Sequence, residues 1–226
     1  MATVSTLLQE EIQLKQGYVR AKRVLDVLIT LLLLPVLCLV MLVVAIFIRL
    51  DSEGPIFYRQ KRVGQDGVEF DMFKFRSMHI NNDDTIHREA MKRYMNGEML
   101  NGHNGAVMTV YKLVDDPRVT RVGRIIRKLS IDELPQFFNV LRGEMSLVGP
   151  RPPLLYEVEE YSSHAHLRLC GKPGITGYWQ VYGRSRVTFD EMIEMDINYL
   201  HQQSILQDVK LIALTVPVAI LGRGGA

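Results

Sequence analysis

An uncharged, apolar run from Val27 to Ile48 constrains this chain more than any other feature of its sequence. Its length of about 22 residues is enough to cross the hydrocarbon core of a bilayer as one helix. A buried helix of that length would be unusual in a chain of 226 residues, so the run predicts contact with a membrane. The run is longer than the apolar part of a signal peptide and lacks a small-residue cleavage site, which excludes that class.

Pro35 interrupts the run and predicts a bend, because its missing N–H leaves the carbonyl of Leu31 without a helical partner. Thr30 carries the nearest hydroxyl that could serve this carbonyl. The segments on either side of Pro35 are each too short to cross the bilayer. Basic residues flank the run at both ends, namely Arg20, Lys22 and Arg23 before it and Arg49, Arg59, Lys61 and Arg62 after it. A spanning helix usually carries positive charge at one end, so the sequence favours a re-entrant helix, with a spanning helix as the alternative.

The apolar run also divides the chain into an interfacial segment (1–23), a membrane helix (24–50) and a cytoplasmic catalytic domain (51–226). The domain is predicted to be α+β and mostly helical. Aromatic alternation around Gln65-Asp66-Gly67 predicts a short β-hairpin formed by residues 56–60 and 68–75. Helices are expected from 81–84 to 94–95, from 115–117 onward, from 130 to 142–143 and over 191–200. The apolar segment 205–221 is interrupted by Asp208, Lys210 and Pro217, so it is expected to pack on the domain or to lie at the membrane interface.

Charge and cysteine content exclude some classes of function. The formal net charge of +2 is too small to indicate a nucleic-acid partner. Cys38 and Cys170 lie far apart, and two such residues make neither a disulfide framework nor a zinc site. The pattern fits a reducing compartment.

The stretch from Ser130 to Pro135 is the candidate catalytic feature. Asp132 and Glu133 stand side by side where a helix is expected to open, and a basic run precedes them. Such a pair suits a site for phosphate and a metal ion. The alternative is a capping box, in which Ser130 and Glu133 satisfy backbone N–H groups at the helix start.

Four basic residues are candidate phosphate contacts. Lys74 and Arg76 lie two residues apart on the far strand of the expected hairpin, and Arg127 belongs to the basic run Arg118, Arg121, Arg124, Arg127 and Lys128. Arg151 lies between Pro150 and Pro152, so it loses little backbone entropy on binding. The stretch from 172 to 184 reads as a glycine-rich, aromatic loop, and it lacks the Gly-Lys-Ser/Thr ending of a P-loop.

These segments together resemble a known family, the bacterial sugar transferases of the monotopic phosphoglycosyl transferase type. The resemblance covers nearly the whole chain and rests on ordered motifs: the basic-flanked apolar run with its proline, Phe73-Lys74-Phe75-Arg76-Ser77-Met78, Ser130-Ile131-Asp132-Glu133-Leu134-Pro135-Gln136, Val148-Gly149-Pro150-Arg151-Pro152, and Lys172-Pro173-Gly174-Ile175-Thr176-Gly177 with Gln180-Val181 and Gly183-Arg184. One departure is Leu34, because family members often carry serine before the membrane proline.

The resemblance implies transfer of a sugar-1-phosphate from a UDP-sugar to polyprenyl (undecaprenyl) phosphate, at the cytoplasmic face of the bacterial inner membrane. Asp132 is then the nucleophile, Glu133 a Mg²⁺ ligand and Asp196 a second acidic metal ligand. The implied phosphate or substrate contacts are Lys74, Arg76, Arg127, Arg151, Gln180 and Arg184. Membrane lipid is an expected partner, nucleic acid is not, and a second copy of the chain is a further candidate partner.

A catalytically silent scaffold is the alternative from another class. It would keep the membrane helix and would bind anionic lipid or a biosynthetic partner through the basic run. It has no use for Asp132, Glu133 and Asp196 together. The sequence does not distinguish one sugar from another.

Overall fold

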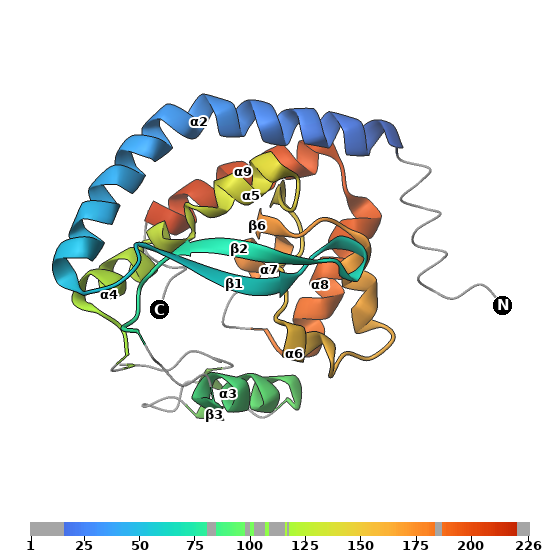
Figure 1. Cartoon of the computed structure of the whole chain (residues 1–226). Coiled ribbons are helices and arrows are strands. Elements are labelled where there is room, and N and C mark those ends of the chain that lie inside the picture. Colours follow the sequence, from blue (N-terminus) through green and yellow to red (C-terminus); the bar gives the residue numbers. More distant parts are fainter. Residues whose placement is uncertain are drawn as a thin grey trace.

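Helix α2 (Gln16–Asp51) arches over the rest of the molecule in the computed structural model (Figure 1). The structure describes residues 16–80, 85–97, 100–101, 107–108, 116, 118–183 and 187–220. Within these ranges α2 is the one helix long and apolar enough to cross a membrane by length and composition. The first limb of α2, before the bend, contacts α5, α9 and β5, and the second limb, after the bend, contacts α4. Both limbs therefore lie against the same domain, and the expected bend is present in Figure 1.

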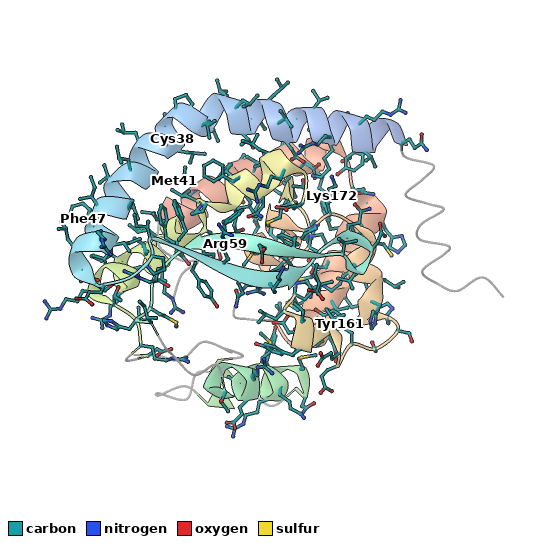
Figure 2. All side chains as sticks on the ribbon, in the orientation of Figure 1. Cys38, Met41, Phe47, Arg59, Tyr161 and Lys172 are labelled. Carbon is teal, nitrogen blue, oxygen red and sulfur yellow. The ribbon has the colours of Figure 1, made fainter. Side chains whose placement is uncertain are left out.

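The two sides of the arch differ in exposure. Met41, Val44 and Ile48 face inward and are buried. Cys38 and Phe47 lie on the outer side, as Figure 2 shows. The outer side is almost wholly apolar, with exposed residues Leu28, Leu31, Leu32, Leu33, Val36, Leu39, Leu42, Val43, Ile46 and Leu50. An apolar face of this length, left uncovered by protein, fits contact with lipid.

Thr30 does not serve the carbonyl that Pro35 frees, contrary to the role considered from the sequence. Its side chain is fully buried, and its Oγ1 makes no hydrogen bond within the described part of the chain.

Strands β1 (Phe57–Val63) and β2 (Glu69–Phe75) form the expected antiparallel hairpin, with η1 (Gln65–Gly67) at its turn. The hairpin crosses the middle of the domain (Figure 1). On β2 the alternate residues Phe70 and Met72 are buried against a core that includes Val140 and Leu147. The burial alternates from Glu69 to Phe73 because successive side chains of a strand point to opposite faces.

A second, parallel pair of short strands was not foreseen. β5 (Ser146–Val148) pairs with β6 (Gly174–Thr176), and helix α7 (Tyr178–Tyr182) follows. The stretch expected to be a loop from 172 onward therefore contains a strand and a short helix. Single-sequence patterns rarely reveal three-residue strands, because pairing with a distant partner decides them.

The helices of the domain match the expectations only in part, because the one expected from residue 130 begins at Gln136 and the helices over Leu155–Val158 and Ala165–Cys170 were not predicted. The helices are α3 (Thr85–Met95), α4 (Arg121–Lys128), η2 (Ile131–Glu133), α5 (Gln136–Arg142), α6 (Leu155–Val158), η3 (Ala165–Cys170), α8 (Phe189–Gln202) and α9 (Ile205–Ile220). The remaining strands, β3 (Leu100–Asn101) and β4 (Val107–Met108), form a two-residue ladder. The helix expected from 115–117 begins later, at Arg121, because Thr120 accepts a hydrogen bond from the N–H of Gly123 and caps it. Gly143 ends α5 in the left-handed conformation, as expected.

A buried carboxylate fastens the first limb of α2 to the C-terminal helices. Asp208 on α9 accepts hydrogen bonds from Lys22 Nζ (2.8 Å), Tyr18 (2.8 Å) and Tyr199 of α8 (2.7 Å). Asp26 of α2 accepts from the Ser146 hydroxyl and so reaches β5. Buried polar groups with several partners fix one geometry, so the arch is attached to the domain by specific contacts as well as by apolar packing.

Candidate active site

The acidic turn lies between α4 and α5 and does not form a capping box. Ser130 adopts the left-handed conformation, with φ 55° and ψ 22°, and its side chain makes no capping hydrogen bond. Asp132 and Glu133 lie in η2, a single 3-10 turn, and α5 begins only at Gln136. A non-glycine residue in this conformation costs roughly 1–2 kcal/mol. Such strain is found most often at functional sites, so the capping alternative loses its structural basis.

Lys74 and Glu133, both predicted site residues, are in direct contact. The ammonium of Lys74 on β2 lies 2.9 Å from Glu133 Oε1. Their side chains are 16 % and 29 % exposed, and Asp132 beside them is partly exposed. Solvent reaches this pair, so a competing cation or anion can exchange with either partner.

A buried amide holds the hairpin against the helix that follows the acidic turn. Asn139 of α5 is fully buried, and its Oδ1 accepts from the N–H of Phe73 (3.0 Å). Its Nδ2 donates to the carbonyl of Asp71 (2.8 Å) and to Glu144 Oε2 (2.7 Å). These bonds fix the strand that carries Lys74 relative to α5. Asn139 was not among the predicted site residues, because no local sequence pattern shows which groups a helical asparagine will bond.

The acidic turn also rests on the second limb of α2. Ile131 and Leu134, on either side of the acids, pack against a cluster that contains Ile48 and Phe75. Asp51, the last residue of α2, accepts a hydrogen bond from the N–H of Val122 at the start of α4 (2.9 Å). Helix α2 thus supports both the acids and the helix that leads to them.

Two arginines pack on the ring of Phe73, the residue before Lys74 on β2. The guanidinium carbons of Arg59 and Arg142 lie 5.5 and 4.8 Å from the ring centre of Phe73. Such cation–π contacts hold arginines in place while leaving their N–H groups available to anions. Figure 2 shows Arg59 on the hairpin at the centre of the view. Arg142 was not among the predicted phosphate contacts.

A buried ion pair supports the turn that carries Arg151. Arg168 of η3 donates to the carbonyl of Arg151 (3.0 Å), to the hydroxyl of Tyr161 (2.7 Å) and to Asp196 Oδ2 (2.5 Å). Arg168 and Asp196 are 2 % and 1 % exposed. Arg151 itself is partly exposed, so its side chain can reach a ligand while its backbone is fixed.

Asp196, a predicted metal ligand, forms a buried ion pair with Arg168. No group of three or more metal-ligating side chains exists among the residues that the structure describes. Burial raises the pKa of Asp196 to about 6, although the positive charge of Arg168 opposes this rise. A desolvated carboxylate paired with an arginine is unsuited to bind Mg²⁺. The family motif placed an acid here, but its partner is 28 residues earlier in the chain.

The other predicted contacts lie at different places around the site. Gln180 of α7 has its Oε1 against Gly177, which in turn abuts the carbonyl of Gly149, at the start of the Arg151 turn. Arg127, in the last turn of α4, is close enough to Asp116 to help Arg118 lower the pKa of that carboxyl. Arg76 is buried under the end of α2. Arg184 lies outside the described residues.

Comparisons with known proteins identify the family of the chain. The family model described as bacterial sugar transferase matches residues 17–222. An exopolysaccharide production protein, ExoY, of Sinorhizobium fredii is 41 % identical, over 90 % of this chain and 87 % of its own length. The galactosyl transferase CpsE of Streptococcus agalactiae is 44 % identical, over 93 % of this chain. The undecaprenyl-phosphate galactose phosphotransferase of Salmonella typhimurium is 38 % identical, over 91 % of this chain. The chain spans less than half the length of the latter two, 44 % and 41 %.

Proposed function

The chain belongs to the bacterial sugar transferase family, and from this premise we propose that it transfers a sugar-1-phosphate from a UDP-sugar to polyprenyl phosphate. The product would be a lipid diphosphate sugar, the first membrane-bound intermediate of an exopolysaccharide or related glycan. The names of the relatives support this reaction class. The observation that carries the proposal is the strained acidic turn, which faces solvent on one side and rests on the membrane helix on the other.

The first half-reaction uses Asp132 as the nucleophile. One carboxylate oxygen attacks the phosphorus that bears the sugar, and the bond from that phosphorus to the bridging oxygen breaks. UMP leaves with the electron pair, and Asp132 holds the sugar-phosphate as an acyl phosphate. Lys74 and the predicted phosphate contacts Arg127 and Arg151 neutralise the charge that spreads over the phosphate oxygens in the transition state.

The second half-reaction regenerates the carboxylate. An oxygen of polyprenyl phosphate attacks the same phosphorus, and the bond from phosphorus to Asp132 breaks. The lipid then carries a diphosphate linked to the sugar, and no net proton transfer is needed if both phosphates are ionised. Two steps allow one small site to accept a soluble donor and a membrane acceptor in turn.

The acidic turn fits a magnesium ion that arrives with the nucleotide. Mg²⁺ in phosphate-transferring enzymes usually takes one or two carboxylates, and the substrate phosphates and water complete its shell. Asp132 and Glu133 supply two carboxylates on one turn. When bound there, Mg²⁺ would neutralise diphosphate charge as a Lewis acid. Lys74 holds Glu133 by a single contact, 2.9 Å long, which a divalent cation can replace.

We further propose that α2 is re-entrant, with both ends and the catalytic domain on the cytoplasmic face. Support comes from the arch, because both limbs lie against one domain and the outer face is apolar. Cysteines placed at Gln16 and Glu53 in a Cys38→Ser background test this. An impermeant maleimide should label both from the cytoplasmic side of sealed vesicles. Labelling from opposite sides would establish a spanning helix instead.

Release of UMP tests the enzymatic proposal. Purified protein in nanodiscs is given polyprenyl phosphate, Mg²⁺ and each member of a panel of UDP-sugars. We expect release with at least one donor, loss of release on chelation, and a fall of about 10³-fold or more in Asp132→Asn. Asp66→Asn is the matched control, because Asp66 is exposed on the hairpin turn at φ 57°, a conformation that asparagine accepts. If no donor led to release of UMP, the catalytically silent scaffold would be the better description of the function.

A further inference from the structure

Arg76 presents a buried cation whose hydrogen-bonding capacity is only partly used. Its side chain is 6 % exposed, and its Nη2 donates to the carbonyl and hydroxyl of Ser52 at 2.7 and 2.9 Å. Its Nε and Nη1 have no hydrogen-bond partner within the described part of the chain. A guanidinium stays charged and carries donors only. Buried donors of this kind almost always have an acceptor. A ligand that carries oxygen atoms would supply one here.

Positive charge next to Arg76 is only partly balanced by negative charge. Burial and the neighbouring positive charge of Arg49 lower the pKa of Arg76, and Asp51 opposes this only in part. Asp51 is also engaged elsewhere, since its Oδ2 accepts from the N–H of Val122. Two guanidinium groups next to one occupied carboxylate favour an added anion.

The turn after α2 is shaped to hold both arginines. The carbonyl of Gly54 accepts from Arg49 Nη1 (3.1 Å). A Cβ atom on Gly54 would lie 2.3 Å from Arg76 Nη1 and 2.3 Å from Ile80 Cδ1, and the φ of +117° disfavours any other residue. A glycine is therefore required for the Arg76 guanidinium to occupy this place.

The position of the two arginines indicates which anion reaches them. Phe47 and Leu50, in the last turns of α2, are 55 % and 78 % exposed, and Figure 2 shows Phe47 on the outer side of the arch. If that side contacts lipid, Arg49 and Arg76 lie at the depth of the phosphate groups. Arg76 also follows Lys74 by two residues, and Lys74 contacts Glu133. A lipid phosphate held here would be next to the acidic turn.

We propose that Arg76 and Arg49 form the site for the phosphate of the acceptor lipid, apart from the groups that hold the UDP-sugar. This rests on the function proposed above. A phosphate monoester with two ionisable oxygens suits two guanidiniums better than a phosphodiester. The other source of a lipid phosphate is bulk anionic phospholipid, and the test distinguishes the two.

The test separates the two half-reactions in nanodiscs. Adduct formation with UDP-sugar alone reports the first, and sugar transfer from a preformed adduct reports the second. In Arg76→Gln and Arg49→Gln we expect the second to fall at least tenfold more than the first, with a raised KM for polyprenyl phosphate. Gly54→Ala, which displaces the guanidinium without removing charge, should have the same effect. Arg20→Gln, an exposed arginine at the other end of α2, is the matched control. Equal loss in both half-reactions, or loss in neither, would overturn the proposal.

A binding measurement keeps the inference testable if no transfer is found. Native mass spectrometry of the full chain in nanodiscs counts polyprenyl phosphate molecules retained by each variant. Retention by wild type and Arg20→Gln, with loss in Arg76→Gln and Arg49→Gln, supports the site even without catalysis. Retention of phosphatidylglycerol in place of polyprenyl phosphate would assign the site to bulk lipid and overturn it. Arg76→Lys controls for folding, because it keeps the charge in the buried position.

Discussion

Two ion pairs flank the substrate region, and they differ in what surrounds them. Lys74 and Glu133 are partly open to solvent, whereas Arg168 and Asp196 are almost completely buried. The open pair belongs to a turn in a strained conformation, and the buried pair belongs to the support of the Arg151 turn. An exposed pair contributes little to stability and can exchange partners, but a buried pair cannot lose one partner without a large penalty. The first pair can therefore exchange its partner for a ligand, whereas the second pair fixes the position of the Arg151 turn.

The largest effect on the fold is expected when the buried pair is broken. Arg168→Met leaves the carboxylate of Asp196 without its counter-charge and should lower the free energy of unfolding by about 3–5 kcal/mol. Adding Asp196→Leu should recover part of this loss, because the double variant has no buried charge to satisfy. Chemical unfolding in detergent micelles measures both, with the exposed Arg93→Met as control. A stability of Arg168→Met equal to that of the Arg93→Met control would contradict the distinction between the two pairs.

A smaller effect is expected at the amide that holds the hairpin. Asn139→Leu leaves the N–H of Phe73 and the carbonyl of Asp71 without their partner, at a cost of about 2–3 kcal/mol. Because Lys74 sits on the same strand, transfer activity should fall together with stability. Unfolding and UMP release are measured on one preparation. Unchanged activity at reduced stability would show that the hairpin does not position Lys74.

The open pair should behave in the opposite way. Lys74→Met removes a partly exposed contact and should change the free energy of unfolding by about 1 kcal/mol or less. Transfer should fall by about 10²-fold, because the charge next to the acids is lost. Lys61→Met is the control, since Lys61 pairs with Asp71 on the same hairpin at 60 % exposure. A stability loss as large as that of Arg168→Met would contradict the distinction.

The smallest expected effect is a dependence of stability on pH that comes from Asp196. Burial raises the pKa of this carboxyl from 3.8 to about 6, so the folded state binds its proton more tightly than the unfolded state. The stability that this provides is present below pH 3.8 and is lost as the pH rises through 6. Between pH 5 and pH 7 the loss should be about 1 kcal/mol. The slope should be smaller in Asp196→Asn, and an identical slope in both proteins would show that another group titrates.

Much of the fold followed from local signals in the sequence. Hydrophobicity predicted α2, the turn at Gln65–Gly67 predicted the hairpin, and Gly143 marked the end of α5. These features depend on neighbours in the chain. The acids and Lys74 were found because they occur in ordered motifs.

What the sequence did not reveal depends on contacts between distant segments. The left-handed Ser130, the bridge made by Asn139 and the pairing of Asp196 with Arg168 have no local signature. Asp196 was therefore assigned to a metal on the basis of its motif, although the fold pairs it with an arginine. The pairing of β5 with β6 was missed for the same reason.

The most direct test of the account is the mass of the protein after exposure to a UDP-sugar and Mg²⁺ without acceptor lipid. Wild type should gain the mass of one sugar-phosphate, the increment should map to the peptide containing Asp132, and polyprenyl phosphate should remove it. Asp132→Asn should gain nothing. Transfer by wild type with no such adduct, or an adduct on another residue, would contradict the claim that the strained acidic turn carries the nucleophile.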